Sequence, residues 1–257
     1  MLRPTKARIA AALATLARPA GSFDAERYFR GGHGLRFYNT GTGPMRALAR
    51  SIYAAHRERW SVDDAMALAD RLIADPYLET KSIGIELVAR YARGFTPTLL
   101  RRWKRWLADG HSANWATTDA ICGLLIGPLL VNHAELAPQM RTWARDPSLW
   151  VRRASIVGLI KPMARNPAAL DVAYDVARAL HRDRHDLIQK AVGWALREAG
   201  KRDAARLERY LRANGASVPR TTVRYAIERF APRKRLELLR ATKPSRSDSA
   251  PWRAPRA

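Results

Sequence analysis

The sequence predicts an all-α protein, built as a superhelical solenoid of antiparallel helix pairs. Three observations support this class. Apolar residues recur with a helical period along almost the whole chain, no stretch alternates with the two-residue period of a strand for long enough to form a sheet, and the helical segments pair at about 35 to 45 residues per pair. With 257 residues, 47% of them hydrophobic, the chain can bury a sizeable core as one domain or as an elongated array of repeats.

The N-terminal region predicts one helix followed by a loop. The stretch IAAALATLA is followed by helix-like charge, so we interpret it as a first helix and not as a signal peptide. The Arg-rich, acid-poor opening makes an organellar transit peptide a less favoured alternative. Residues 30–43, RGGHGLRFYNTGTG, are rich in glycine but lack the Lys-Ser/Thr of a P-loop. They therefore predict a mobile loop and not a nucleotide site.

The next helices have recognisable ends. Ser61 precedes Asp64 by three residues, a near relative of the capping box, and opens a helix over 61–75; a second helix follows over 79–93.

A third helix is predicted over 96–110. Thr96 and Pro97 serve as its cap and first helical residue, and Gly110 is the usual C-terminal glycine.

The helical period continues to the C-terminal region. The predicted helices cover roughly 114–129, 134–145, 149–163, 168–181, 186–200, 203–214, 220–230 and 233–241. Helix pairs of this length favour a solenoid of the HEAT or armadillo type. Such a solenoid builds a long concave surface, and a basic concave face would fit a nucleic-acid duplex.

The charge of the chain points to a polyanionic partner. Lys and Arg number 46 against 23 Asp and Glu, which gives a formal charge of +23 and a pI near 11.3. Residues 242–257 contribute a net +3 of this charge, so residues 1–241 are themselves strongly basic. We predict that residues 1–241 form a single domain and that residues 242–257, basic and rich in Pro and Ser, are a disordered tail.

Cysteine and histidine usage argues against metal sites and disulfides. Cys122 is the only cysteine, which fits a reducing cytoplasm. His181 and His185 have the i, i+4 spacing of a metal-binding pair, but no third ligand is evident, so we expect no metal. No run of 18 or more apolar residues is present, so we expect no membrane span.

The segment NWATTDAICG, residues 114–123, carries a carboxylate where a buried helix begins. At about 100° per residue, Trp115 and Asp119 project together, in one stripe with Cys122 and Ile126. Taken alone, this W-x-x-x-D spacing more often means a packed tryptophan with a capping or ion-paired aspartate.

Tryptophans interleaved with basic residues recur on two later helices. The segments are LWVRRASIVGLI, with Trp150, Arg152 and Arg153, and DLIQKAVGWALREAGK, with Lys190, Trp194 and Arg197. Each segment alone fits a core tryptophan beside a solvated basic face. Their repetition on successive helices is what a surface that binds phosphates and sugars requires.

In combination these segments resemble the AlkD-type DNA glycosylases, the HEAT-like-repeat DNA alkylation repair family. NWATTDAI, DPSLWVRRASIVGLI and above all IQKAVGWALREAGK carry the resemblance in content, order and separation, and it extends more loosely from about residue 25 to 243. The resemblance implies a monomeric crescent that binds damaged duplex DNA in its concave face. It also implies hydrolysis of the N-glycosidic bond of cationic alkylpurines, chiefly 3-methyladenine and 7-methylguanine, without flipping the base.

The resemblance assigns roles to particular residues. It implies that Trp115 and Trp194 contact the deoxyribose at the lesion, that Asp119 is the catalytic carboxylate, and that Arg153 contacts the backbone nearby. Tyr28 matches a further residue on the lesion side less closely.

The other basic residues and the expected chemistry complete the hypothesis. We assign Arg152, Lys190 and Arg197 to DNA phosphates. A cationic purine leaves as a neutral base without a general acid, so the expected site needs a carboxylate to stabilise the developing sugar cation, but no metal and no cofactor. The expected location is the cytoplasm, associated with the nucleoid.

Two departures and three alternatives stay open. The neighbours of the tryptophan in NWATT lack the additional aromatic or acidic residues common in the family, which affects substrate preference, and the glycine-rich loop at 30–43 is longer than usual. The alternatives are a non-catalytic relative that binds damaged or branched DNA, a HEAT-like scaffold for an acidic protein and, more weakly, a membrane-surface protein.

Overall fold

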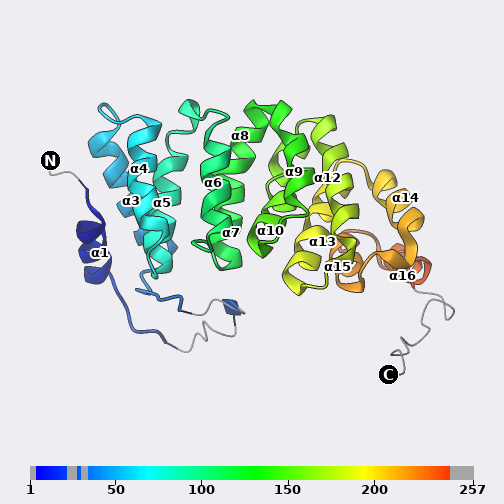
Figure 1. The fold of residues 1–257 in the computed structure, drawn as a ribbon. Coiled ribbons are helices and arrows are strands. Elements are labelled where there is room, and N and C mark those ends of the chain that lie inside the picture. Colours follow the sequence, from blue (N-terminus) through cyan, green and yellow to red (C-terminus); the bar gives the residue numbers. More distant parts are fainter. Residues whose placement is uncertain (1–3, 22–27, 30–33, 244–257) are drawn as a thin grey trace, which may run out of the picture.

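The computed structural model describes residues 4–21, 28–29 and 34–243, and in them the all-α prediction is confirmed. Helices stand side by side in an elongated array, with α1 at one end and α16 at the other (Figure 1). Within the described residues the only β-type pairing is one bridge between Arg36 and Tyr77. The helices are α1 Lys6–Thr15, α3 Thr42–His56, α4 Val62–Ile73, α5 Leu78–Ala89, α6 Leu99–Ala108, α7 Trp115–Ile121, α8 Gly127–Asn132, α9 Met140–Trp143, α10 Leu149–Val157, α11 Ile160–Met163, α12 Pro167–Ala179, α13 Asp186–Gly200, α14 Ala204–Asn214, α15 Arg220–Ala226 and α16 Pro232–Ala241.

The predicted ends of α4 and α6 are confirmed in part. Ser61 and Asp64 form a capping box, in which each side chain accepts a hydrogen bond from the other residue's backbone N–H. Gly110, just beyond α6, has φ +75°, which favours glycine. The helix α6 starts two residues later than predicted. The carbonyls of Thr96 and Pro97 accept hydrogen bonds from the N–H groups of Leu99 and Leu100, three residues on, which is a tighter turn than that of an α-helix.

Several predicted helices are interrupted. The segment predicted at 134–145 is a 3₁₀ helix, Ala134–Gln139, followed by the short α9, because Pro138 removes a backbone donor. The helix predicted at 114–129 consists of α7, a π-helical turn at Cys122–Ile126, and α8. The helix α3 was not predicted.

The glycine-rich stretch is anchored where the structure describes it. Arg36 donates its backbone N–H to Pro76 and accepts from Leu78, both at 2.9 Å, and the ring of Tyr38 stacks on Tyr77 with centroids 4.0 Å apart. Residues 36 to 38 are thus fixed to the start of α5, so the expectation of a mobile loop is wrong for them. Residues 30–33 of this loop and residues 244–257 of the predicted tail lie outside the described part of the chain.

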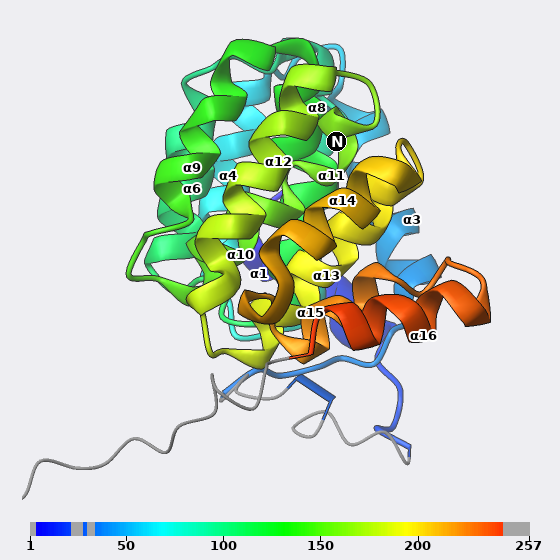
Figure 2. The same ribbon diagram turned by 90° about the vertical axis from the view of Figure 1, so that its right-hand side faces the viewer.

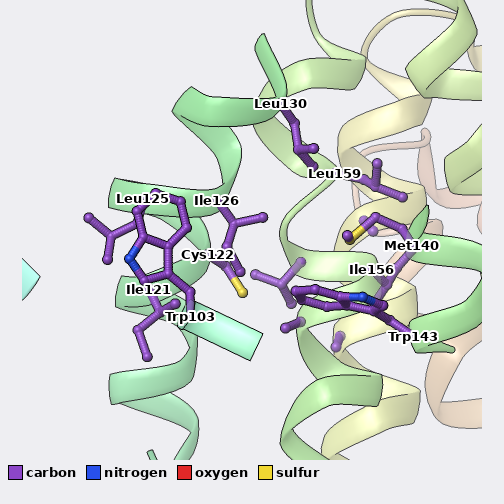
Figure 3. Packing of buried hydrophobic residues seen from close by; sticks show 14 of the residues in the cluster. Trp103, Ile121, Cys122, Leu125, Ile126, Leu130, Met140, Trp143, Ile156 and Leu159 are labelled. Atoms are coloured by element: carbon purple, nitrogen blue, oxygen red, sulfur yellow. The ribbon is translucent and has the colours of Figure 1, made fainter. Parts of the chain in front are cut away.

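The core runs continuously along the array between neighbouring helices. Figure 3 shows its central part, where Trp103 of α6, Cys122 and Ile126 of the π-helical turn, and Trp143 of α9 pack with Ile156 of α10. Each of these side chains is at most 4% exposed, so neighbouring helices of the array share one tightly packed core.

In the described residues, one segment meets the length and hydropathy criteria for a membrane span. It is Trp115–Asn132, with mean hydropathy 1.3, and half of it is buried inside the helix array. Core helices commonly meet both criteria.

The close packing of α15 against α13 depends on a glycine. Gly193 of α13 faces α15 so closely that a Cβ there would lie 2.4 Å from the Cβ of Tyr225 and 2.8 Å from the carbonyl oxygen of Thr222. The missing side chain lets α15 lie directly against α13. An end-on view shows α15 and α16 below α13 (Figure 2).

Candidate nucleic-acid site

A buried ion pair joins Asp119 of α7 to Arg153 of α10. The Nε and Nη2 atoms of Arg153 donate to Oδ1 and Oδ2 of Asp119 at 2.8 and 2.7 Å, a two-point contact that fixes both planes. The side chain of Asp119 is 17% exposed and that of Arg153 is 7% exposed, so a small part of the Asp119 side chain reaches the surface.

The same arginine reaches a third helix. Its Nη1 atom donates to the carbonyl oxygen of Leu187, in the first turn of α13, at 2.5 Å. The first two turns of α7, α10 and α13 therefore meet around the guanidinium. This arrangement places on one local surface three segments that are far apart in the sequence.

The ionisation of Asp119 reflects two opposing effects. Burial raises the pKa of the carboxyl above its usual value, and the hydrogen bonds and charge of Arg153 act against that rise. A carboxyl that accepts on both oxygens from a guanidinium is ionised. Burial and the charge of Asp119 together raise the pKa of the Cys122 thiol well above its usual value, so Cys122 is a neutral core residue.

Trp115, one turn before Asp119, belongs to an aromatic cluster. Its indole lies beside the ring of Tyr28, with centroids 5.3 Å apart, and stacks on Phe29 at 5.7 Å. The indole N–H donates to the carbonyl oxygen of Tyr28 at 3.4 Å, and Phe29 in turn stacks on Phe37. The structure thus brings Tyr28 to Trp115, although the two are far apart in the sequence, while the Tyr28 ring stays exposed.

Trp194 lies farther along α13. It is partly buried and packs on the core two turns beyond Leu187. No ring or hydrogen-bond contact links it to Trp115 or Asp119 among the described residues. Trp194 is linked to Asp119 only indirectly: α13 carries both Trp194 and Leu187, and Arg153 binds both Leu187 and Asp119.

The three basic residues assigned to phosphates all have protein partners. Arg152 binds Asp183 at 2.8 Å and also donates to the carbonyls of Asp146 and Pro147, so it braces the loop before α10. Lys190 pairs with Asp186 one turn earlier, at 2.7 Å.

Arg197 pairs through Nη1 with Glu228, two residues beyond the end of α15, and its Nε atom lies 3.5 Å from Oε1 of Glu198. Its Nε atom is buried without a hydrogen-bond partner among the described residues. The pairs of Lys190 and Arg197 are partly exposed and can exchange partners with an anion in solvent.

Comparison with known proteins identifies the family. A family model described as "DNA alkylation repair enzyme" matches residues 9–230. The chain belongs to the DNA alkylation repair enzyme family. A solved structure titled "Predicted DNA alkylation repair enzyme from Enterococcus faecalis" superposes with a TM-score of 0.70 at 16% identity, over 80% of this chain and 93% of that chain. This likeness confirms the HEAT-like fold. A search of curated proteins finds no match.

The resemblance to the DNA alkylation repair family is therefore confirmed, whereas the individual site residues stay predictions. Within the described residues, no group of three or more His, Cys, Asp or Glu side chains could hold a metal. His181 instead hydrogen-bonds the hydroxyl of Tyr210 at 2.8 Å, and His185 caps α13 by accepting from the N–H of Leu187.

The candidate site also contains features that sequence reasoning missed. Phe29 and Phe37 complete the cluster around Trp115, and the "RYF" and "RFY" patterns were the available signal. The π-helical turn begins three residues after Asp119 and shifts the helical register by one residue, so Cys122 and Ile126 turn fully into the core.

A buried lysine fixes the approach to α7. Lys81 of α5 donates to the carbonyl of Ile73 at 2.6 Å and to that of His111 at 2.8 Å. His111 lies in the loop that leads to Asn114, whose side chain caps α7 by accepting from the N–H of Thr117. Lys81 therefore helps to position α7, which carries Trp115 and Asp119.

Proposed function

We propose that this protein is a monofunctional DNA glycosylase. It hydrolyses the N-glycosidic bond of cationic alkylpurines, 3-methyladenine and 7-methylguanine, in duplex DNA, and it acts as a monomer without flipping the base. The family activity on DNA alkylation damage supports this proposal, as does the net charge of +23. The proposed location is the cytoplasm, in association with the nucleoid.

The chemistry requires little of the protein beyond charge and position. Alkylation at N3 or N7 makes the purine a cation, and breaking the glycosidic bond releases a neutral base. The electron pair of the bond leaves with the base, so positive charge develops on the sugar. A carboxylate beside the sugar stabilises that charge and orients the water that completes hydrolysis.

The observation that carries the proposal is the geometry of Asp119. Arg153 occupies one lone-pair position on each carboxylate oxygen, which leaves others for a water or a substrate cation. Arg153 also holds the carboxylate in one orientation, so the charge is fixed before substrate arrives. Pre-arranged charge of this kind avoids reorganisation during the reaction.

The tryptophans and basic residues complete the proposed roles. Electron-rich indole faces of Trp115 and Trp194 favour a sugar that carries positive charge. Lys190 and Arg197 bind phosphates by exchanging their carboxylate partners for DNA. Arg152, held by two carbonyls and Asp183, contributes a fixed positive charge near the backbone.

The test of activity is release of free base from defined duplexes. Wild-type protein is incubated with oligonucleotide duplexes that contain one 7-methylguanine or one 3-methyladenine, and with an unmethylated control, in buffer with EDTA. The proposal expects free methylated base and an abasic site that alkali cleaves, only in the methylated duplexes. Tight duplex binding without release from either lesion contradicts it.

A non-catalytic duplex-binding protein is the second candidate. The observation that favours it is that both oxygens of Asp119 are already bound by Arg153, as in a purely structural ion pair. In that case the same basic surface binds damaged or branched DNA, and no base is released.

A further inference from the structure

The C-terminal helices α15 and α16 carry a dense basic surface that the site residues do not include. Residues 220–243 contain eight Lys or Arg and two Glu. Both glutamates are occupied: Glu228 by Arg197, and Glu237 by Arg212 and Lys234.

Five arginines of this segment are exposed and have no ion-pair or hydrogen-bond partner for their side chains in the described part of the chain. They are Arg224, Arg229, Arg233, Arg235 and Arg240. So many like charges close together repel one another, and a polyanion relieves that repulsion. The surface also includes Leu236, 58% exposed, between Arg233 and Arg240 on the outward face of α16.

This basic surface borders the candidate site directly. The helix α15 runs beside α13. The hydroxyl of Thr222 donates to the carbonyl of Gln189 at 2.9 Å, and the missing side chain of Gly193 leaves room for Tyr225. One turn on, Glu228 binds Arg197. The contacts follow α13 from its first turn past Trp194, so a duplex on that face extends toward α15.

The helix α16 lies against the start of α15 and beyond the family model. Arg220 donates to the carbonyl of Leu239 and to the hydroxyl of Thr242, which holds the two helices together. The family model ends at residue 230, whereas α16 covers Pro232–Ala241. Figure 1 shows α15 and α16 next to α13, at the opposite end of the array from α1.

We propose that α15 and α16 form a second duplex-binding surface, which holds the undamaged arm of DNA that leaves the lesion site past α13. The inference rests on the proposed function for the position of the lesion. Its ligand is the phosphate backbone, without base recognition, since Arg233 and Arg240 share one face of α16 and can contact neighbouring phosphates. The surface increases the affinity for long duplexes and leaves the chemical step unchanged.

The test compares duplexes of different arm length. A short duplex has about six base pairs on each side of a central 7-methylguanine, and two longer duplexes extend one arm or the other by about ten base pairs, roughly one helical turn at 3.4 Å per base pair. Fluorescence anisotropy measures binding of wild type, of an Arg233→Ala/Arg235→Ala/Arg240→Ala variant, and of a control variant, Arg93→Ala/Arg101→Ala/Arg105→Ala. The control removes the same charge from exposed arginines, without side-chain partners in the described residues, near α5 and on α6.

We expect wild type to bind one of the two longer duplexes at least about tenfold more tightly than the short one at moderate salt. The α16 variant loses this gain, and its slope of log K against log salt falls by about 2 to 3. The control variant keeps both. If the α16 variant keeps the gain and the slope, or if the two variants lose them equally, the proposal is wrong.

Excision keeps this test separate from that of the proposed function. Single-turnover base release with saturating protein on the short duplex should be equal in wild type and the α16 variant. If neither protein releases base but the difference in arm-dependent binding persists, the glycosylase proposal fails and the second surface stands. If wild type releases base with no arm dependence, the glycosylase proposal stands and the second surface fails.

Discussion

The guanidinium of Arg153 binds both carboxylate oxygens of Asp119, at 2.8 and 2.7 Å, and a backbone carbonyl of a third helix. Under the proposed function, one residue pair thus combines a structural and a chemical task. It joins α7, α10 and α13, and it holds a carboxylate ready at the edge of the surface. Changes at either residue therefore need a stability measurement beside any measurement of activity.

Removing the arginine should destabilise the fold strongly. Arg153→Leu leaves a buried carboxylate without its partner, which typically costs about 3 to 5 kcal/mol of unfolding free energy. Urea denaturation followed by circular dichroism measures it. The control is Arg57→Leu, whose pair with Glu58 is exposed, and its loss should stay below about 1 kcal/mol. Equal losses of unfolding free energy in the two variants would show that the buried pair does not stabilise the packing of the three helices.

Two glycines should respond to alanine in opposite directions. At Gly193 the added Cβ meets Tyr225 and Thr222 below 3 Å, so Gly193→Ala forces α13 and α15 apart and costs about 1 to 3 kcal/mol or more. At Gly123 nothing lies within 4 Å of a Cβ, so Gly123→Ala should stabilise the helix by about 0.5 to 1 kcal/mol. Thermal and urea unfolding of both variants check the prediction, and the same sign for both would refute it.

The buried lysine predicts a pH dependence of stability. Burial lowers the pKa of Lys81 from 10.5 to about 8, while Asp75 acts to raise it and Lys6 to lower it further. Between these two pH values the unfolded chain binds a proton that the folded chain does not, so the contribution of Lys81 to the unfolding free energy rises with pH.

The variant Lys81→Met isolates this contribution. The difference in unfolding free energy, wild type minus variant, should increase by about 1 kcal/mol from pH 7 to pH 9. Urea titrations at both pH values measure it. A difference that stays constant or decreases would mean that Lys81 keeps an ordinary pKa in the fold.

Periodicity and capping patterns were sufficient to predict the helical class and several boundaries. The predicted helix at 186–200 coincides with α13 Asp186–Gly200, and the capping box at Ser61 forms as expected. These features depend on residues within a few positions of one another. The early end of regular helix at Cys122 was not predictable in this way, because a π-helical turn depends on how the neighbouring helices pack.

The candidate site was predictable in its residues but not in its contacts. The pattern W-x-x-x-D placed Trp115 and Asp119 on one helix face, and the resemblance named Arg153. That Arg153 binds Asp119 across 34 residues follows from which helices are neighbours in the array. The same holds for Lys81, which reaches a carbonyl 30 residues away, and for the stacking of Phe29 on Trp115.

The most direct measurement is the single-turnover rate of 7-methylguanine release by Asp119→Asn on a duplex with a single lesion. Asparagine keeps the size of the side chain and one acceptor oxygen but removes the negative charge. The control, Asp175→Asn, removes a carboxylate that also accepts two hydrogen bonds from an arginine, Arg141, away from the site. We predict a loss of at least about 100-fold for Asp119→Asn, with duplex affinity and folded state retained, and little change for Asp175→Asn. A rate for Asp119→Asn within a few-fold of wild type would contradict the assignment of Asp119 as the catalytic carboxylate.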